Sequence, residues 1–152
     1  MKRILLFGLF GFFAQSAFSQ ASILNIQNVT NCTVYFKIVG GSGGGGCISG
    51  IQSSLITLAP GGTLTYTAGT TNPPGFPPTT ATPYNAAIVF SQPTSCTTPP
   101  AISTNLGEPC TGRAPTAHID NFTGTCSMCS PNINIAWTAT TTQGGTANLR
   151  FQ

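Results

Sequence analysis

Two cysteines, Cys126 and Cys129, form a C-x-x-C pair in the stretch GTCSMCSPNINIAW at residues 124–137. Such a pair can serve thiol–disulfide exchange, metal binding or a structural disulfide. In redox catalysis it stands at a helix N-terminus, where the helix dipole stabilises a thiolate. Here Pro131 opens an alternating segment that is typical of a β-strand, so no helix is predicted. We therefore interpret the pair as structural rather than redox-active.

The other ligand residues do not complete a metal or haem site. Zinc needs two further ligands at a suitable spacing, but His118 is the only histidine of the chain. Covalent haem attachment needs a histidine directly after the second cysteine, where Ser130 stands. The sequence predicts no metal and no cofactor.

Six cysteines in a chain with an export signal indicate a disulfide framework. They are Cys32, Cys47, Cys96, Cys110, Cys126 and Cys129. The spacing favours a local set, Cys32–Cys47, Cys96–Cys110 and Cys126–Cys129, although other pairings of the six stay open. Each of the two longer loops would stabilise the fold by about 3 kcal/mol through restriction of the unfolded chain.

Catalytic carboxylates and nucleophiles are scarce. His118 and Asp120 fall on one face of a predicted strand and could imitate part of a hydrolase triad, but the G-x-S-x-G nucleophile motif is absent. Glu108 is the only other acid after residue 20, and it lies in a predicted loop before a proline, which argues against a glycosidase pair with Asp120. Two carboxylates are also a poor supply for a Ca²⁺ site. We predict that the protein is not an enzyme and that His118 and Asp120 form a surface pair.

The first residues have the pattern of an export signal. Lys2 and Arg3 precede an apolar run over residues 4–13, and Ala17 and Ser19 are the small residues that a signal peptidase requires. We expect cleavage ahead of Gln20, which leaves residues 20–152 as a single domain. The apolar run is too short to span a membrane. The predicted location is secreted, periplasmic or cell-surface.

Residues 20–152 carry little charge. Lys37, Arg113 and Arg150 oppose Glu108 and Asp120, a net charge of +1. Nucleic-acid binding needs many phosphate-neutralising cations, and a polybasic membrane patch needs a cluster of them. The composition therefore argues against nucleic-acid and membrane-surface partners. It favours association with other protein chains, because a net charge near zero gives little repulsion between copies. A glycan is the other partner that a weakly charged surface allows.

Period-two alternation of apolar and polar residues recurs along the chain and predicts strands. The clearest segments are residues 33–39, 133–142 and 146–151, and shorter ones lie near residues 23–29, 85–91 and 117–122. The stretch SLITLAPGGTLTYT predicts a hairpin with Pro60 and Gly61 at the turn, and TQGGT predicts a second hairpin between the last two strands.

About eight short strands in one domain predict an all-β fold, a small antiparallel β-sandwich held by disulfides. Phe36 and Trp137 are the expected central core residues. A closed β-barrel is the alternative.

The Pro-rich segment at residues 68–84 is the first candidate binding loop. Phe76 lies between two proline pairs and Tyr84 ends the segment. Aromatic rings at loop tips are typical platforms for sugar stacking, so Phe76 and Tyr84 are the expected contacts of a glycan-binding module. A second long segment, residues 92–116, is expected to be a loop tied by a disulfide.

The final hairpin is the candidate assembly element. Threonines at every second position give it a flat polar face, as at Thr138, Thr140 and Thr142. This pattern is ordinary for a solvent-facing strand, but it also suits a glycan, an ice-like lattice or another subunit. If the hairpin lies at a sheet edge, only Arg150 protects it against strand addition.

Three N-x-T triplets match the N-glycosylation pattern, at Asn28, Asn31 and Asn121. With this much threonine, chance matches are expected, and the sequence leaves their modification open.

These observations predict an exported, non-catalytic protein. The favoured function is a structural or adhesive subunit of a cell-surface or periplasmic assembly. The alternative is a secreted glycan-binding module, and ice binding and redox activity are less well supported.

Overall fold

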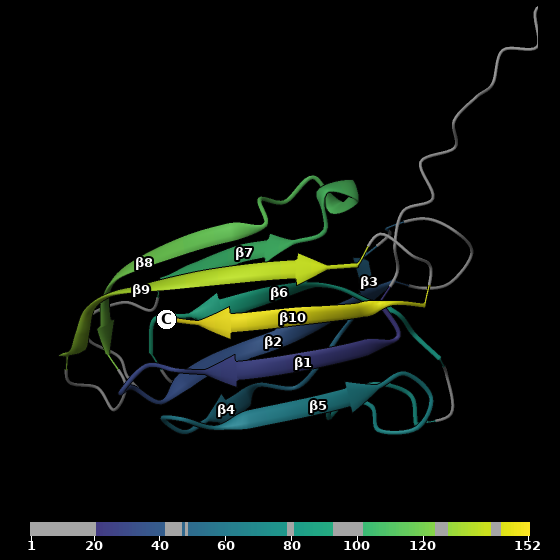
Figure 1. Ribbon diagram of the computed structural model, residues 1–152, viewed down its shortest axis with the longest axis horizontal. Coiled ribbons are helices and arrows are strands. Elements are labelled where there is room, and N and C mark those ends of the chain that lie inside the picture. Colours follow the sequence, from purple (N-terminus) through teal and green to yellow (C-terminus); the bar gives the residue numbers. More distant parts are fainter. Residues whose placement is uncertain are drawn as a thin grey trace, which may run out of the picture.

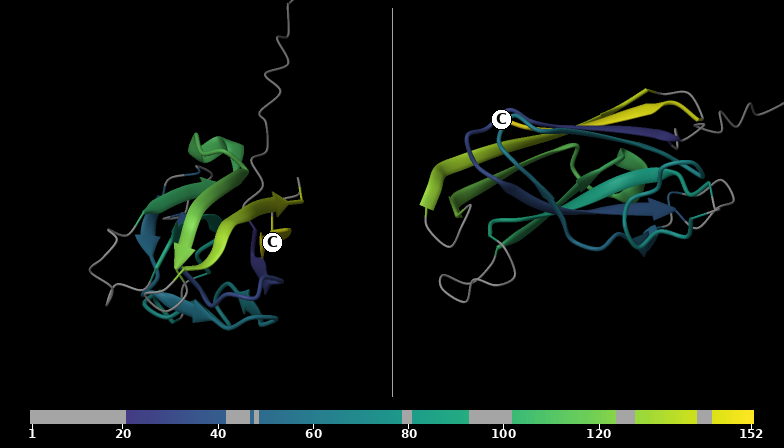
Figure 2. Two further views of the ribbon diagram at one scale, coloured as in Figure 1. Left: turned by 90° about the vertical axis from the view of Figure 1, so that its left-hand side faces the viewer. Right: turned by 90° about the horizontal axis from the view of Figure 1, so that it is seen from below.

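Two β-sheets packed face to face make up the computed structural model (Figures 1 and 2). The structure describes residues 21–41, 47, 49–78, 81–92, 102–123, 128–140 and 144–152. The predicted export signal, residues 1–19, lies outside them. Within the described residues the two sheets stay separate and neither closes into a barrel. The prediction of a disulfide-containing all-β sandwich is therefore confirmed.

The first sheet, called the front sheet because it faces the viewer in Figure 1, has the strand order β5-β1-β10-β9-β8. Its strands are β1 (Ile23–Asn28), β5 (Thr63–Thr67), β8 (Thr116–Thr123), β9 (Met128–Ala139) and β10 (Thr146–Phe151).

The second sheet, called the back sheet, has the order β3-β2-β6-β7, and β4 also pairs with β2. Its strands are β2 (Val34–Gly41), β3 (Ser49–Gln52), β4 (Ile56–Leu58), β6 (Tyr84–Phe90) and β7 (Ser103–Gly107). The only helix among the described residues is η1 (Pro109–Thr111), and a helix of this length cannot cross a membrane.

The core lies between the sheets and follows from the alternation in the sequence. Because successive side chains of a strand point to opposite faces, one set of alternate residues is buried as a group. Phe36 and Trp137 belong to it, with 0% and 2% of their surface exposed, as predicted. Phe36 of the back sheet packs on Phe151 of the front sheet with ring centroids 5.4 Å apart, which joins the two layers.

One strand pair departs from the predicted antiparallel pattern. β1 and β10 run parallel, in register from Ile23 opposite Thr146 to Asn28 opposite Phe151. Parallel neighbours need a long connection, and here nearly the whole domain separates the two strands. Both strands are interior to the front sheet, since β1 also pairs with β5 and β10 also pairs with β9.

The predicted hairpin over residues 54–67 is wrong in its pairing. The turn forms as expected, with Gly61 at φ +69° and the Gly62 N–H donating to the Ala59 carbonyl at 3.0 Å. However, β4 pairs with β2 in the back sheet and β5 pairs with β1 in the front sheet. The chain therefore passes from one layer to the other at this turn, because each strand finds a longer apolar partner elsewhere.

Two strands were not predicted from the sequence. β7 falls inside the segment expected to be a long loop, and β3 follows the Gly-rich segment. Both are short edge strands with few large apolar residues, so their alternation is weak. Their pairing to β6 and β2 supplies the ladder hydrogen bonds that define them.

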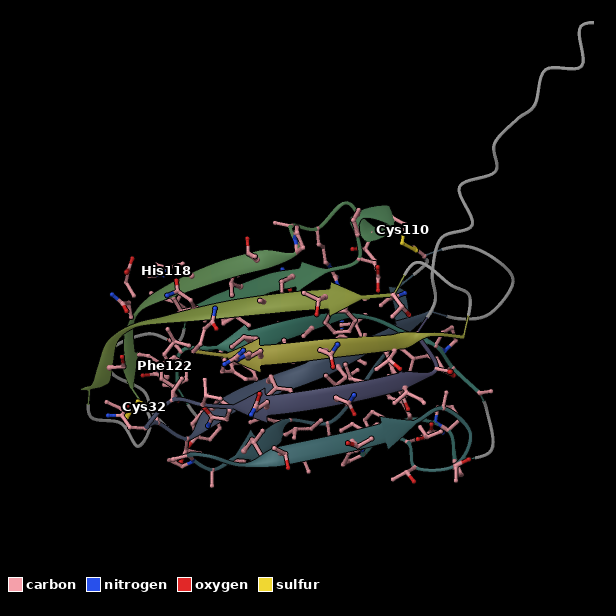
Figure 3. The ribbon with its side chains drawn as sticks, in the orientation of Figure 1. Cys32, Cys110, His118 and Phe122 are labelled. Carbon is pink, nitrogen blue, oxygen red and sulfur yellow. A yellow bond between two sulfur atoms is a disulfide. The ribbon has the colours of Figure 1, made fainter. Side chains whose placement is uncertain are left out.

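The predicted local disulfide set is wrong. Cys32 bonds to Cys129, and Cys47 bonds to Cys110, so neither Cys32–Cys47 nor Cys96–Cys110 forms, and Cys129 is not joined to Cys126. The labelled Cys32 and Cys110 show that the two bonds lie at opposite ends of the sandwich (Figure 3). Cys96 and Cys126 lie outside the described residues.

Topology explains these long-range pairs. β2 and β7 both pair antiparallel with β6, so they run in the same direction and finish at the same end of the sandwich. Cys47 follows β2 and Cys110 follows β7, which brings the two together. Cys32 precedes β2 and Cys129 lies at the beginning of β9, at the other end. Spacing along the chain carries no information about this arrangement.

Candidate functional site

Phe76 and Tyr84, the predicted glycan-stacking residues, are buried. Phe76 is 6% exposed and Tyr84 is fully buried, and their ring centroids lie 6.0 Å apart. Burial raises the pKa of the Tyr84 phenol to about 12, and Tyr66 adds to the shift. A Cβ atom at Gly40 of β2 would lie 2.8 Å from the Phe76 ring, which is closer than side-chain atoms pack in proteins. Only glycine leaves room for the ring there, so the Pro-rich segment packs tightly on the back sheet. The two rings therefore anchor this segment and present no stacking surface to a ligand.

His118 and Asp120 form the surface pair that the sequence predicted. The His118 Nε2 atom lies 2.9 Å from the Asp120 carboxylate, and its Nδ1 atom lies 2.8 Å from the Asn134 Oδ1 atom. The Asn134 and Asp120 hydrogen bonds both raise the pKa of His118. Because both ring nitrogens face oxygen atoms, the arrangement favours the imidazolium form rather than a general base.

The final hairpin is not an edge element, so its role as an assembly strand is not supported. β9 lies between β8 and β10, and β10 lies between β9 and β1. Arg150 of β10 therefore has register partners on both sides, Gln27 of β1 and Ala136 of β9. Thr138 of β9 pairs with Asn148 of β10, and it lies beyond Ala136, the last β9 residue that pairs with β8. Thr140 follows β9 and lies outside the ladder, and Thr142 lies outside the described residues. The edges of the front sheet are β5 and β8 instead.

Two adjoining hollows on the outer face of the front sheet, both lined in part by amide and hydroxyl side chains, form what we call the outer-face groove. A hollow of about 670 Å³ spans β5, β1, β10 and β9, and a second of about 440 Å³ continues it over β9 and β8. The two share Ala136 and Gln152 in their linings. Figure 3 looks onto the front sheet and labels His118 of β8, which lines the second hollow.

Strand register arranges the lining side chains in cross-strand rows. One row runs Thr65, Asn25, Asn148, Thr138 from β5 to β9. The next row runs Thr63, Gln27, Arg150, Ala136, Thr116 from β5 to β8. Directly opposite residues in such rows lie within side-chain contact distance. The groove is therefore a consequence of register, and Ala136 leaves a gap beside Arg150 because its side chain is the smallest of its row.

Hydrogen bonds fix part of the first row. The Thr65 hydroxyl donates to the Asn25 Oδ1 atom at 3.0 Å, and the Asn25 Nδ2 atom donates to the Asn148 Oδ1 atom at 3.3 Å. These bonds orient the amides before any ligand arrives, which lowers the entropy cost of binding.

Arg150 is the only charged residue that lines the larger hollow of the outer-face groove, and the second hollow holds His118, which is paired with Asp120. It is exposed, and none of the ion pairs among the described residues involves it. Of the two acids after residue 20, Glu108 points into the core and Asp120 contacts His118 on β8, two strands away from β10. The groove is thus rich in hydrogen-bond donors and has one uncompensated positive charge.

Glu108 is a buried acid between the sheets. Only 6% of it is exposed, and its Oε1 atom accepts a hydrogen bond of 3.1 Å from the Trp137 indole N–H. Burial raises the pKa of this carboxyl, and the Trp137 hydrogen bond partly opposes that shift. Sequence reasoning placed Glu108 in a loop, but the alternation that begins in β7 continues through it and turns its side chain inward.

Glu108→Gln is expected to reduce the pH dependence of stability. A carboxyl with a raised folded-state pKa favours the fold below its unfolded pKa, and that contribution is lost as pH rises through the folded value. Glutamine keeps an acceptor for Trp137 and removes the titration. Thermal unfolding in mildly acidic and mildly alkaline buffer, followed by Trp137 fluorescence, measures the effect. Glu108→Ala is the control and should lose about 1–3 kcal/mol because the indole N–H then has no acceptor. An unchanged pH dependence in Glu108→Gln would contradict the assignment.

Asn28, the first of the N-x-T asparagines, has a structural role. It is fully buried, and its Nδ2 group lies within 2.7–3.1 Å of the carbonyl oxygens of Cys32, Leu58 and Ala59. Its Oδ1 atom accepts bonds from the backbone N–H and the hydroxyl of Thr30. An amide in these contacts has no room for a sugar. Asn31 is exposed, and the side chain of Asn121 lies outside the described part of the chain.

The groove was only partly foreseen from the sequence. Alternating threonines at residues 138–142 predicted a flat polar face, but Asn25, Gln27 and Asn148 were not identified as partners. Their own alternation with Leu24, Ile26 and Leu149 is the signal that could have found them. The parallel pairing of β1 with β10, which brings the three amides together, has no local signal.

No protein-family model, curated protein or solved structure matches the chain.

Proposed function

We propose that this is an exported, non-catalytic adhesive protein that acts by binding polysaccharide at the cell surface or in the periplasm. The observation that carries the proposal is the outer-face groove, which crosses all five strands of the front sheet. A groove of this length suits an extended chain, and its amides and hydroxyls match the hydroxyl groups of sugars.

The composition of the groove favours a glycan over other macromolecules. Protein interfaces are enriched in aromatic residues, methionine and arginine, and of these only Arg150 lines the groove. Nucleic acid needs a set of cations along the phosphate backbone, and Arg150 is the only lysine or arginine in the lining of the groove. The scarcity of carboxylates after residue 20 supports a binding protein rather than a glycosidase.

Blocking the groove is expected to abolish polysaccharide binding. Ala136→Trp places a bulky side chain at the point where the two hollows meet, and tryptophan is well tolerated on a strand. Native affinity electrophoresis in gels that contain xylan, alginate or polygalacturonate measures the retardation of each protein. Asn105→Trp, on the exposed face of β7 in the back sheet, is the matched control and should migrate like the unmodified protein. Equal retardation of both variants, or no retardation in any gel, would rule out the proposal.

A second candidate is a structural subunit that assembles by strand addition at β5. The Asn28 N–H donates to the Gly62 carbonyl, and the Ala68 N–H donates to the Ser22 carbonyl. The backbone N–H and C=O groups of the even-numbered residues between 62 and 68 therefore point toward β1. The backbone groups of Thr63 and Thr65 therefore point to the open edge, and β5 carries no charge that would deter pairing. Light scattering of the same preparations distinguishes the candidates, since assembly through β5 predicts concentration-dependent oligomers that Ala136→Trp leaves intact.

A further inference from the structure

The outer-face groove has a centre that differs chemically from the rest of it. Arg150 occupies the middle position of its cross-strand row, between Gln27 of β1 and Ala136 of β9. Along its own strand the same face carries Asn148 before it and Gln152 after β10. The guanidinium is thus surrounded by amides and one methyl group, with no acid among its row or strand neighbours.

This environment leaves the guanidinium available to an anion. Arginine presents a planar fork of donors that matches the two oxygens of a carboxylate. The Gln27 and Gln152 amides are free of side-chain hydrogen bonds among the described residues, and so can contact the hydroxyls next to such a carboxylate. Lys37, by comparison, is half-buried on the outer side of β2 in the back sheet, away from the groove.

We propose that the ligand of the groove is an acidic polysaccharide, and that Arg150 receives the carboxylate of one uronic acid residue. The inference rests on the proposed function, because it names the substrate class of the same groove. A single guanidinium selects one carboxylate at a fixed position in the bound segment. The amides and threonine hydroxyls on either side contact the neighbouring sugar rings.

The test compares ligands that differ only in charge. Polygalacturonate carries a carboxylate on each sugar, and its fully methyl-esterified form has the same backbone without charge. Alginate supplies uronic acids of other stereochemistry, and dextran sulfate supplies sulfate in place of carboxylate. Affinity electrophoresis ranks these ligands, and titration calorimetry with the tightest of them gives the dissociation constants.

Three variants separate the guanidinium from charge in general. Arg150→Gln is expected to weaken binding to the uronate by about tenfold or more, because a charge-assisted bidentate contact is lost. Arg150→Lys keeps the positive charge but loses the two-pronged guanidinium contact. Its affinity for the uronate should lie between that of the unmodified protein and that of Arg150→Gln. Lys37→Gln removes the same charge from the opposite face, and should bind like the unmodified protein. Trp137 fluorescence and circular dichroism confirm that each variant is folded.

The outcomes distinguish this inference from the proposed function. Binding of uronate that is lost on esterification and on Arg150→Gln supports it. If Ala136→Trp abolishes binding but the methyl ester binds as well as the acid, or Arg150→Gln has no effect, the groove binds neutral glycan and the inference is wrong. Preference for dextran sulfate also overturns it. If none of the polysaccharides binds, both proposals fail.

Discussion

Asn28→Asp is expected to destabilise the protein by about 3–5 kcal/mol at neutral pH, enough to unfold a domain of ordinary stability. The Asn28 Nδ2 group donates toward three backbone carbonyls, those of Cys32, Leu58 and Ala59. A carboxylate in its place cannot donate, and it sets a buried negative charge against three oxygen atoms. Equilibrium unfolding in denaturant, followed by Trp137 fluorescence, measures the loss.

The destabilisation should decrease in acid. A protonated aspartic acid has one O–H donor and no charge, so the buried site favours this form and raises the pKa of the new carboxyl. The loss of unfolding free energy will therefore grow as pH rises through that pKa. Asn28→Ala should cost about 3 kcal/mol and show no such pH dependence. Asn148→Asp, on the exposed face of neighbouring β10, is the matched control and should change stability by no more than about 0.5 kcal/mol. A stable Asn28→Asp protein at neutral pH would show that the hydrogen bonds of the Asn28 amide to the Cys32, Leu58 and Ala59 carbonyls are not needed for stability.

Removing the Cys32–Cys129 bond is expected to cost about 4–5 kcal/mol. The two cysteines are 97 residues apart in sequence, so the bond closes nearly the whole domain into one loop and strongly restricts the unfolded chain. The Cys32→Ser and Cys129→Ser double variant, compared with the unmodified protein by denaturant unfolding without reductant, gives this value. It exceeds the loss expected of the local pairs that sequence spacing favoured, because loop entropy rises with length.

The Cys47→Ser and Cys110→Ser double variant is the matched control. Its bond spans 63 residues, so the entropic model predicts a loss smaller by only about half a kcal/mol. Peptide mapping of the unmodified protein should recover Cys32 with Cys129 and Cys47 with Cys110. If all six cysteines are oxidised, as the sequence predicts, Cys96 and Cys126 are the remaining pair for the mapping to find. A peptide that links Cys32 to Cys47 would contradict the structure.

Most strands could be predicted because alternation is a local signal. Val34, Phe36 and Ile38 share one face, and Ile133 and Ile135 do the same, and the structure buries all of them. Strand pairing could not be predicted in the same way. The Pro60–Gly61 turn specifies a bend in the chain, but the same bend can join two strands of one sheet or carry the chain across to the other sheet.

Candidate site residues were harder to predict because their role depends on what lies across from them. Phe76 looked exposed in its proline-rich context, but Gly40 of β2 leaves a space in which its ring is buried. Arg150 was identified as the guard of an edge strand. Its position in the middle of a sheet depends on the parallel pairing of β10 with β1, whose residues lie far away in the sequence.

That parallel pairing also determines how the domain responds to tension. β1 and β10 run in the same direction, so the point where the chain enters β1 and the point where it leaves β10 lie at opposite ends of the front sheet. A force that pulls these two points apart acts along both strands and loads the hydrogen bonds between them in shear. All six register pairs must then yield together, whereas a hairpin pulled from its open end loses its bonds one at a time. The adhesive function proposed above requires this kind of mechanical resistance of a protein that is held between a cell and a surface.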